Sequence, residues 1–361
     1  MLNILVVRLR LVGDVALTTP LLRALRRTFP DARLTYVVEP AAAPILHGNP
    51  HVSSVVVVPK GRGLARIRQD LSAARALRRA RFDVAIDLHG GPRAAWFTLA
   101  SRAPMRIGYD ITGRTWVYTH VVRRAPDNAP RHAVANQWDL LAPLDISRPD
   151  PAGDPLEMVE DPAAARRVAE RLAEAGISDQ PLVVVHVSAG NQFRRWPHES
   201  FEGLVATLAR RDPRRRIVLT SGPSDAGAAR AIAEAARAGL GPLAEAVPEL
   251  GEFDLAELHA LIGRASMYIG GDSGPLHVAA TTRTPIVALF GPTLPERSMP
   301  WRDPRLTAEA VDAGALECRP CRQRVCVPGD FRCLTRISVE AVVAAAERAM
   351  GAPGARQEHG T

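Results

Sequence analysis

Residues 268–280 read Tyr-Ile-Gly-Gly-Asp-Ser-Gly-Pro-Leu-His-Val-Ala-Ala. The apolar start predicts a strand, and Pro275 near the following turn predicts the first turn of a helix. Free backbone N–H groups and the positive end of the helix dipole point outward at such a turn, which makes it an anion site. A purely structural turn would not need three glycines and a serine within residues 270–274. We therefore predict that this turn holds a phosphate.

The same rhythm of strand and helix extends along the chain in both directions. Short β-branched runs alternate with amphipathic stretches, which is typical of parallel sheets covered by helices. Prolines crowd residues 143–155, as in an extended linker. We expect domains at residues 1–150 and 156–335, a last helix at 338–350 and a polar tail at 352–361. The predicted strands are Asn3–Arg8, Arg33–Val38, Ser54–Val58, Val84–Leu88, Leu182–Val187, Ile217–Thr220, Met267–Gly270 and Pro285–Phe290.

The composition indicates which chemical class of molecule the protein binds. The chain has 361 residues, 47% of them hydrophobic, and a formal charge of +8, so we expect two cores and an acidic partner. A nucleotide, a phosphorylated substrate, nucleic acid or an anionic membrane surface would fit. Only 5% of the residues are aromatic, which disfavours stacking on nucleic acid. The apolar runs are too short for a signal peptide or a membrane span, so we expect a cytoplasmic protein that could lie on a membrane.

A helix between the third and fourth predicted strands should face the core with its apolar side. Its basic outer side fits either a solvated face or contact with an anionic lipid or phosphorylated glycolipid. The apolar positions are Leu64, Ile67, Leu71, Ala74 and Leu77, and the basic ones are Arg66, Arg68, Arg75, Arg78 and Arg79.

Polar side chains follow the predicted strands of the first domain. Asp14 lies just after the first strand, where open α/β sheets bind ligands, and it could act as a general base or as a helix N-cap. Only Gly13 is present where a dinucleotide fingerprint needs three glycines, which argues against an NAD-dependent oxidoreductase. His89 and Arg93 follow the fourth strand, and His132 lies at the start of a later helix. These histidines fit either ligand contacts or structural roles.

Polar and small residues also follow the predicted strands of the second domain. Small residues around Ser188 let backbone N–H groups approach a phosphate, and Arg194 could bind it bidentately. Asp225 could meet a ribose hydroxyl. His277 would add a donor at the glycine-rich turn, while Asp272 would orient the loop or meet a sugar hydroxyl.

The four cysteines all fall near the C-terminus. Cys318, Cys321, Cys326 and Cys333 have a spacing that zinc could accept, but cytosolic thiols are often simply buried. We leave both interpretations open and assign no metal or cofactor.

Three motifs in this order resemble glycosyltransferase family 9, the heptosyltransferase family, over nearly the whole chain. Within that family, the sequence of this chain is similar to the branch called heptosyltransferase III. The motifs are Gly13-Asp14 with Thr18-Thr19-Pro20, Arg194-Arg195-Trp196-Pro197, and Asp272 to His277 followed by Ala279-Ala280.

The resemblance implies a fold and a reaction. It implies the GT-B arrangement, two Rossmann-like domains facing across a cleft, with the last helix packing back on the first domain. It implies inverting transfer of heptose from ADP-heptose to a lipopolysaccharide inner core, without an essential metal and without nucleic acid, on the cytoplasmic face of the inner membrane. Asp14 would be the general base, and Arg93 and His132 would contact the acceptor.

On the donor side, the resemblance implies contacts from the second domain. Arg194 departs from the family, which most often has lysine there, and so leaves room for another nucleotide sugar or glycan acceptor. A non-catalytic nucleotide or nucleic-acid binding protein is the alternative outside this class. The implied donor-binding residues are Ser188, Arg194, Asp225, Phe253, Asp272, Ser273, Gly274 and His277.

Overall fold

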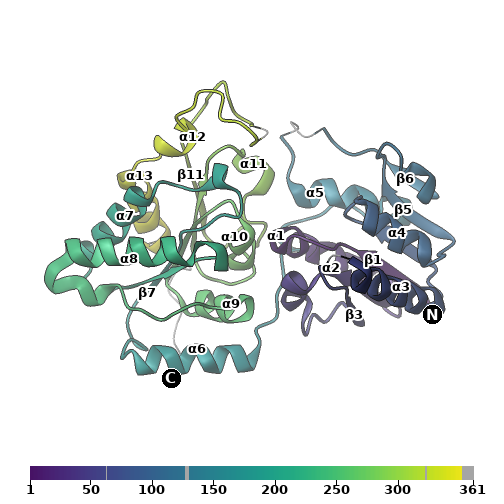
Figure 1. The fold of residues 1–361 in the computed structure, drawn as a ribbon, viewed down its shortest axis with the longest axis horizontal. Helices are drawn as coiled ribbons and strands as arrows, with labels where there is room; N and C mark the ends of the chain where they lie inside the picture. Colours follow the sequence, from purple (N-terminus) through teal and green to yellow (C-terminus); the bar gives the residue numbers. More distant parts are fainter. Residues whose placement is uncertain (62, 127–129, 322, 352–361) are drawn as a thin grey trace. The chain divides into compact units, whose positions relative to one another are not determined.

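The computed structural model describes residues 1–61, 63–126, 130–321 and 323–351. The chain divides into two compact units, Met1–Val159 and Glu160–Thr361 (Figure 1). Each unit is a parallel sheet with helices packed on it, so the predicted α/β class is confirmed.

In the described part of the first unit, six parallel strands form a sheet in the order β3-β2-β1-β4-β5-β6. The strand order reverses between β1 and β4, the topological switch point of a doubly wound sheet. The strands are β1 (Asn3–Val7), β2 (Arg33–Val38), β3 (Ser54–Val57), β4 (Val84–Asp87), β5 (Met105–Tyr109) and β6 (His120–Val122). The helices are α1 (Val12–Ala16), α2 (Thr19–Thr28), α3 (Gly63–Ala80), α4 (Pro92–Ala100) and α5 (Ala133–Trp138).

Helix α3 differs from the prediction. Its C-terminal half packs through Ala74 and Leu77, but Leu64, Ile67 and Leu71 are exposed. The regular apolar spacing indicated a helix correctly. It did not show that the first two turns extend beyond the surface that the sheet offers for packing.

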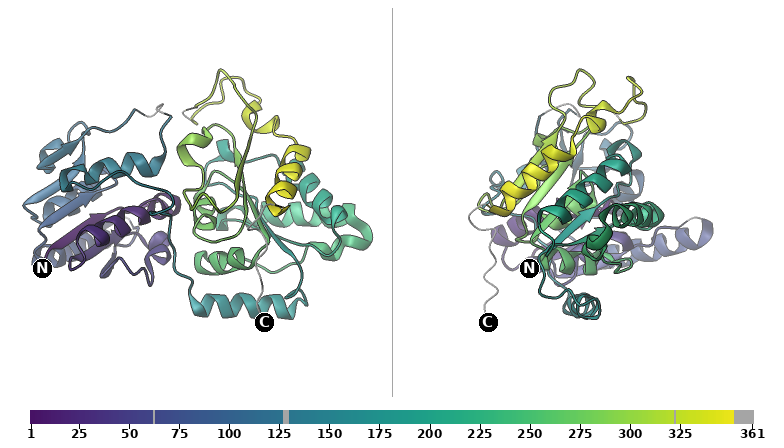
Figure 2. Two further views of the ribbon diagram at one scale, coloured as in Figure 1. Left: turned by 180° about the vertical axis from the view of Figure 1, so that it is seen from behind. Right: turned by 90° about the vertical axis from the view of Figure 1, so that its left-hand side faces the viewer.

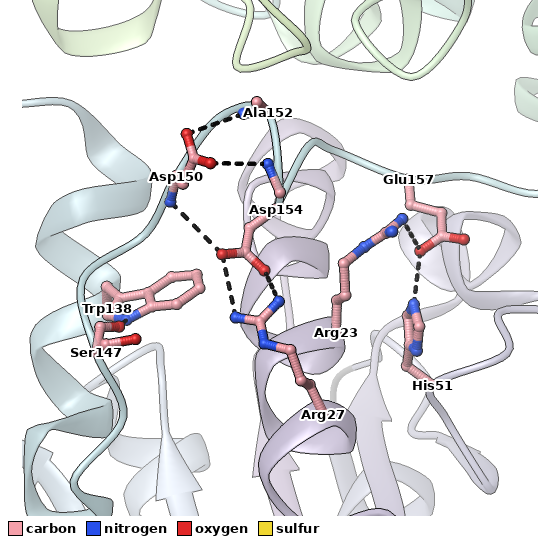
Figure 3. Close-up of polar contacts among 10 residues, drawn as sticks. Arg23, Arg27, His51, Trp138, Ser147, Asp150, Ala152, Asp154 and Glu157 are labelled. Atoms are coloured by element: carbon pink, nitrogen blue, oxygen red, sulfur yellow. Dashed lines mark hydrogen bonds and ion pairs between the residues drawn. The ribbon is translucent and has the colours of Figure 1, made fainter.

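The proline-rich segment is folded onto the first unit and is not a free linker (Figure 3). Asp154 is buried, and its carboxylate binds the Arg27 guanidinium at 2.6 and 3.3 Å. Glu157 forms an ion pair with Arg23 at 2.9 Å and contacts His51 at 3.0 Å. These contacts hold the segment against α2, where sequence composition alone suggested an extended chain.

The second unit has its own sheet in the order β11-β10-β9-β7-β8 across the described residues. Its strand order reverses between β7 and β9. The strands are β7 (Leu182–His186), β8 (Arg216–Thr220), β9 (Met267–Gly271), β10 (Ile286–Phe290) and β11 (Ala308–Asp312). The helices are α6 (Pro162–Glu174), α7 (His198–Arg211), α8 (Ala226–Leu240), α9 (Leu255–Arg264), α10 (Gly274–Ala279), α11 (Pro295–Ser298), α12 (Arg332–Thr335) and α13 (Val339–Gly351).

The last helix corrects a second expectation. We expected it to pack back on the first domain, but its apolar face lies in the core of the second unit. Val342, Val343 and Ala346 are fully buried there, and α13 lies alongside α7 (Figure 2). The core of the second unit removes this apolar face from water, so the face does not need the first unit to cover it. The predicted tail, 352–361, lies outside the described residues.

Candidate active site

Two loops of the first unit meet at its switch point. β1 leads to α1, which carries Asp14, and its neighbour β4 leads to His89. Ligands of open parallel sheets bind at the carboxyl ends of strands at such a point. The geometry therefore places the candidate base where the fold can offer it to a ligand.

Asp14 is held on one side only. Its Oδ2 atom forms an ion pair with Nη2 of Arg8 at 2.6 Å and accepts a hydrogen bond from the backbone N–H of Leu11 at 3.3 Å. Asp14 is the third residue of α1, so it is not the N-cap itself. In the described part of the chain Oδ1 accepts no hydrogen bond, and the side chain is 38% exposed. One carboxylate oxygen is thus fixed and the other is left to accept a proton.

The end of β4 is ordered by a buried carboxylate. Asp87 accepts hydrogen bonds from the backbone N–H groups of His89 and Gly90, at 2.9 and 2.8 Å, and from the Tyr118 hydroxyl at 2.7 Å. Burial raises the pKa of Asp87 above its usual value. The group shapes the loop that carries His89.

His89 itself is a neutral ring at pH 7. Burial, followed by the charges of Arg8 and Arg10, lowers its pKa to about 4. A Cβ atom at Gly91 would lie 2.5 Å from Cδ2 of His89, so any other residue there would displace the His89 ring. His89 can offer a neutral hydrogen-bonding ring beside Asp14 but not a positive charge.

A cavity of about 650 Å³ lies next to this loop in the first unit. Arg93 lines it, and its guanidinium is already bound by Asp70 and Glu39, with the shortest contacts at 2.5 and 2.9 Å. His132 is not among the lining residues. It caps α5, where its Nδ1 accepts the backbone N–H of Val134 at 3.2 Å. The structure thus brings Arg93 and His89 together and gives His132 a structural contact.

In the second unit, three candidates lie at one edge of the sheet. Ser188, Asp225 and Asp272 follow β7, β8 and β9, which are neighbours in the order β9-β7-β8. Ser188 Oγ accepts the backbone N–H of Gly222 at 2.8 Å and lies 3.2 Å from the buried His186 ring. Burial lowers the pKa of His186 to about 4, so it is a neutral partner.

Two consecutive arginines connect these strand ends. Arg194 forms an ion pair through Nη1 with Asp272 at 3.0 Å, and its Nε donates to Oε1 of Gln323 at 2.7 Å. Arg195 forms an ion pair with Asp225 at 2.9 Å. Nη2 of Arg194 has no hydrogen bond among the described residues. The guanidinium is fixed on two sides and keeps one donor edge for a ligand.

The glycine-rich turn has both packing and binding features. A Cβ at Gly270 would lie 2.5 Å from the Tyr268 hydroxyl, so close packing explains that glycine. Asp272 Oδ1 accepts a hydrogen bond from Ser298 at 2.9 Å, which fixes the loop. Ser273 occupies the N-cap position of α10, directly before Gly274, and its buried Oγ has no hydrogen-bond partner in the described residues.

Beside the end of β8 is a small cavity of about 100 Å³ lined by Ser221, Gly251 and Phe253. The Phe253 ring lies 5.0 Å from the guanidinium carbon of Arg171, a cation–π contact. His277 is buried inside α10. The candidates of the second unit therefore lie at the ends of neighbouring strands or in the turns beyond them, and a cavity lined by Phe253 lies beside the end of β8.

Comparison with known proteins gives the family. The family model "Glycosyltransferase family 9 (heptosyltransferase)" matches residues 71–331. The chain belongs to this family. It is therefore a glycosyltransferase, and the predicted enzyme class is confirmed.

Curated relatives match most of the family 9 chain. Lipopolysaccharide heptosyltransferase 3 of Escherichia coli (strain K12) is 30% identical over 347 residues, which cover 93% of this chain and 94% of that protein. A second lipopolysaccharide heptosyltransferase 3 from Escherichia coli is 28% identical, over 88% of this chain and 91% of that one.

Solved structures support the predicted GT-B fold class, which is confirmed. The family 9 glycosyl transferase from Veillonella parvula DSM 2008 superposes with a TM-score of 0.83 at 25% identity, over 96% of this chain and 97% of that one. E. coli ADP-heptose lps heptosyltransferase II gives a TM-score of 0.74 at 20% identity, over 97% and 98%, which is a likeness of fold. No described helix is long and apolar enough to cross a membrane.

The four cysteines of the family 9 chain line a further cavity of about 800 Å³ with Phe193 and Phe331. Burial raises the pKa of Cys333. Within the described ranges, no group of three or more His, Cys, Asp or Glu side chains is arranged to hold a metal ion.

Sequence reasoning missed two residues that hold the candidates in place. Arg8 could have been found, because it is the last residue of a predicted strand and lies shortly before Asp14. Gln323 could not, because its contact with Arg194 spans 129 positions and carries no local signal.

Proposed function

We propose that this family 9 enzyme transfers a heptose from ADP-heptose to a lipopolysaccharide inner core, with inversion at the anomeric carbon. The names of the two E. coli relatives, which the chain matches over most of its length, support the sugar and the acceptor class. The observation that carries the mechanism is the Asp14 carboxylate, held by Arg8 through Oδ2 and left with Oδ1 to accept a proton.

Asp14 acts as the general base. An acceptor hydroxyl attacks the anomeric carbon while its proton passes to Oδ1 of Asp14, and the bond from that carbon to the diphosphate oxygen breaks with release of ADP. One base suffices for such a displacement, and a positioned base typically contributes about 10²–10⁴-fold to the rate. The neutral His89 ring beside it can orient the acceptor hydroxyl without adding charge.

The second unit holds the donor and stabilises the leaving group. The free Nη2 edge of Arg194 and the unpartnered hydroxyl of Ser273 are suited to diphosphate oxygens, because charged and preorganised donors stabilise the charge that develops there. Ser188, Gly274 and His277 complete this side, Asp225 and Asp272 meet the ribose or heptose hydroxyls, and Phe253 lies along the adenine.

The acceptor binds to the first unit. The cavity beside His89 is lined by Arg10, Lys60 and Arg66 besides Arg93, and by the carboxylates of Glu39 and Asp70 that bind Arg93. Its basic side chains outnumber its acidic ones, which suits an anionic sugar-bearing lipid. His132 is proposed as a further contact on grounds of the family resemblance, although its Nδ1 already caps α5. The enzyme works at the cytoplasmic face of the inner membrane, as a peripheral protein on its anionic surface and without nucleic acid.

A second donor is favoured by one residue. Arg194 stands where the family most often has lysine, and a guanidinium presents a fixed planar fork in place of a mobile point charge. Transfer of another nucleotide sugar, or transfer to another glycan, is the alternative that this residue supports.

The test separates the base from donor binding. Asp14→Ala should lower ADP release from ADP-heptose and a lipopolysaccharide core by about 10²–10⁴-fold. ADP-heptose binding measured by calorimetry should stay within about twofold, because the proposed donor contacts come from the second unit. Asp31→Ala, an exposed carboxylate of the same unit, is the matched control and should leave both unchanged. Loss of donor binding in Asp14→Ala, or retained transfer, would contradict the assigned role.

A further inference from the structure

Helix α3 presents large apolar side chains to solvent. Leu64 is 74% exposed, Ile67 51% and Leu71 40%, although the helix is continuous with the packed turn around Leu77. At 3.6 residues per turn these three side chains fall within about 60° of one another around the helix axis. They form a single ridge.

Basic residues continue the same face. Arg68, Arg75, Arg78 and Arg79 project within about 120° of arc that also contains the apolar ridge, at about 100° per residue. We call Leu64, Ile67, Leu71 and these four arginines the α3 face. Its first half is apolar and its second half is basic.

The charge of the α3 face is not compensated on the helix. Its four arginines have no ion pair or hydrogen bond among the described residues. The one acidic residue of α3, Asp70, is buried and bound to Arg93 and Arg66. The α3 face thus combines exposed apolar side chains with unpaired positive charge.

We propose that the α3 face docks on an anionic phospholipid bilayer. Helices that lie in a membrane interface combine apolar side chains, which enter the acyl boundary, with basic side chains that bind anionic headgroups. Nucleic acid would use the arginines but leave the ridge exposed to water, and an acidic protein would need a groove that this convex helix does not offer. Charge complementarity and the ridge together favour the bilayer.

The location adds a reason. Ile67 and Leu71 from the ridge also line the cavity that contains Arg93. Docking through α3 brings the opening of that cavity to the lipid surface. This step rests on the proposed function, in which the cavity receives a lipid-anchored acceptor.

The full chain is tested by flotation with vesicles of phosphatidylcholine alone and with about one-third phosphatidylglycerol. The wild type should bind the anionic vesicles, bind the neutral ones weakly, and lose binding as salt rises. Changing Arg75→Gln, Arg78→Gln and Arg79→Gln together should weaken binding about a hundredfold, since each basic residue near the surface contributes about a factor of five.

A matched control removes the same charge elsewhere. Arg211→Gln, Arg264→Gln and Arg336→Gln together change three exposed arginines of the second unit and should leave vesicle binding within about twofold. Equal weakening by both triple variants would overturn the α3 face as the docking surface and indicate net charge alone.

The ridge is tested separately. Changing Leu64→Ser, at a position outside the cavity, should weaken vesicle binding about tenfold, because an exposed leucine side chain loses little in the fold but loses burial in the membrane. Transfer to a deacylated, water-soluble core should stay unchanged, while transfer to the same core embedded in vesicles falls. Unaltered flotation of this variant, or tighter binding to duplex nucleic acid than to vesicles, would overturn the proposal. Flotation remains decisive even if no transfer is measured at all.

Discussion

Arg8 directly follows β1, and Arg194 lies in the loop after β7. Each of these arginines holds a carboxylate in place. Arg8 fixes one oxygen of Asp14, and Arg194 fixes Asp272. Both carboxylates could be identified from the sequence, because strand ends in α/β sheets collect ligand-binding groups. The ion pair with Arg8 explains how the partly exposed Asp14 can keep one orientation, whereas Asp272 is buried.

Gln323 gives the first prediction at the scale of a single side chain. Gln323→Leu should weaken ADP binding about tenfold, because Arg194 loses the charge-assisted hydrogen bond that orients its Nε. Titration calorimetry with ADP measures this. Thr293 provides the control, because its hydroxyl accepts a hydrogen bond from Nε2 of the same Gln323 side chain at 3.4 Å. Thr293→Val should change ADP affinity by less than about twofold, and an equal effect of both variants would count against the role of Gln323.

His259 makes the stability of the second unit pH-dependent. It is buried on α9, neither ring nitrogen has a hydrogen-bond partner in the described residues, and burial lowers its pKa to about 4. The unfolded chain, with a histidine pKa near 6.5, therefore binds more protons between pH 6.5 and 4. The contribution of His259 is complete above pH 6.5 and is lost as the pH falls, by about 1.4 kcal/mol per pH unit.

In the variant His259→Leu, the unfolded chain no longer binds the extra proton at this position as the pH falls. Denaturant unfolding at pH 7, 6 and 5 should show a shallower loss of stability than in the wild type, with stability at pH 7 kept or raised because an unpaired polar ring is replaced by an apolar one. Identical slopes in the two proteins would refute this account of His259.

At the scale of helices and strands, the sequence located the central strands well. β2 was predicted with its bounds, and β1, β4, β9 and β10 within one residue. These strands are buried on both faces, so their apolar runs are unbroken. It missed β5, β6 and β11, although it located β3 and β8, which also lie at sheet edges. The missed strands are short or are interrupted by polar and small residues, such as Arg106 and Gly108 in β5, so they lack an unbroken apolar run.

Two helices were recognised from the sequence, but how their apolar sides are covered was predicted only in part for α3 and wrongly for α13. Periodicity indicates that a helix has an apolar side, and it does not say which surface covers that side. For α3 the structure leaves Leu64, Ile67 and Leu71 exposed, and for α13 it supplies a cover from α7 and the second sheet. The candidate site has the same limit, since contacts such as Arg194 with Gln323 depend on tertiary structure.

Helix α13 gives a prediction at this scale. Val343→Ala should lower the free energy of unfolding by about 2 kcal/mol, because it removes buried methyl groups and leaves a cavity in the core of the second unit. Glu340→Ala, on the exposed side of the same helix, should change stability by less than about 0.5 kcal/mol. Denaturant unfolding of the full chain measures both. A negligible effect of Val343→Ala would contradict the packing of α13 described above.

At the scale of the whole molecule, the chain repeats one arrangement in two units. Each unit reverses its strand order once, between β1 and β4 and between β7 and β9, and each places candidate side chains beyond the strands at that point. The first set offers a carboxylate with a free oxygen, and the second offers a guanidinium edge and small residues. This division matches a reaction that needs a base for one substrate and a grip on the diphosphate of the other.

The central claim is heptose transfer from ADP-heptose to a lipopolysaccharide core. The most direct measurement is the release of nucleoside diphosphate from a panel of ADP- and UDP-sugars, each offered with lipopolysaccharide cores truncated at successive sugars. We predict release from ADP-heptose alone, with one inner-core acceptor far better than the others. Preference for a UDP-sugar, or release that does not depend on any core, would contradict the claim.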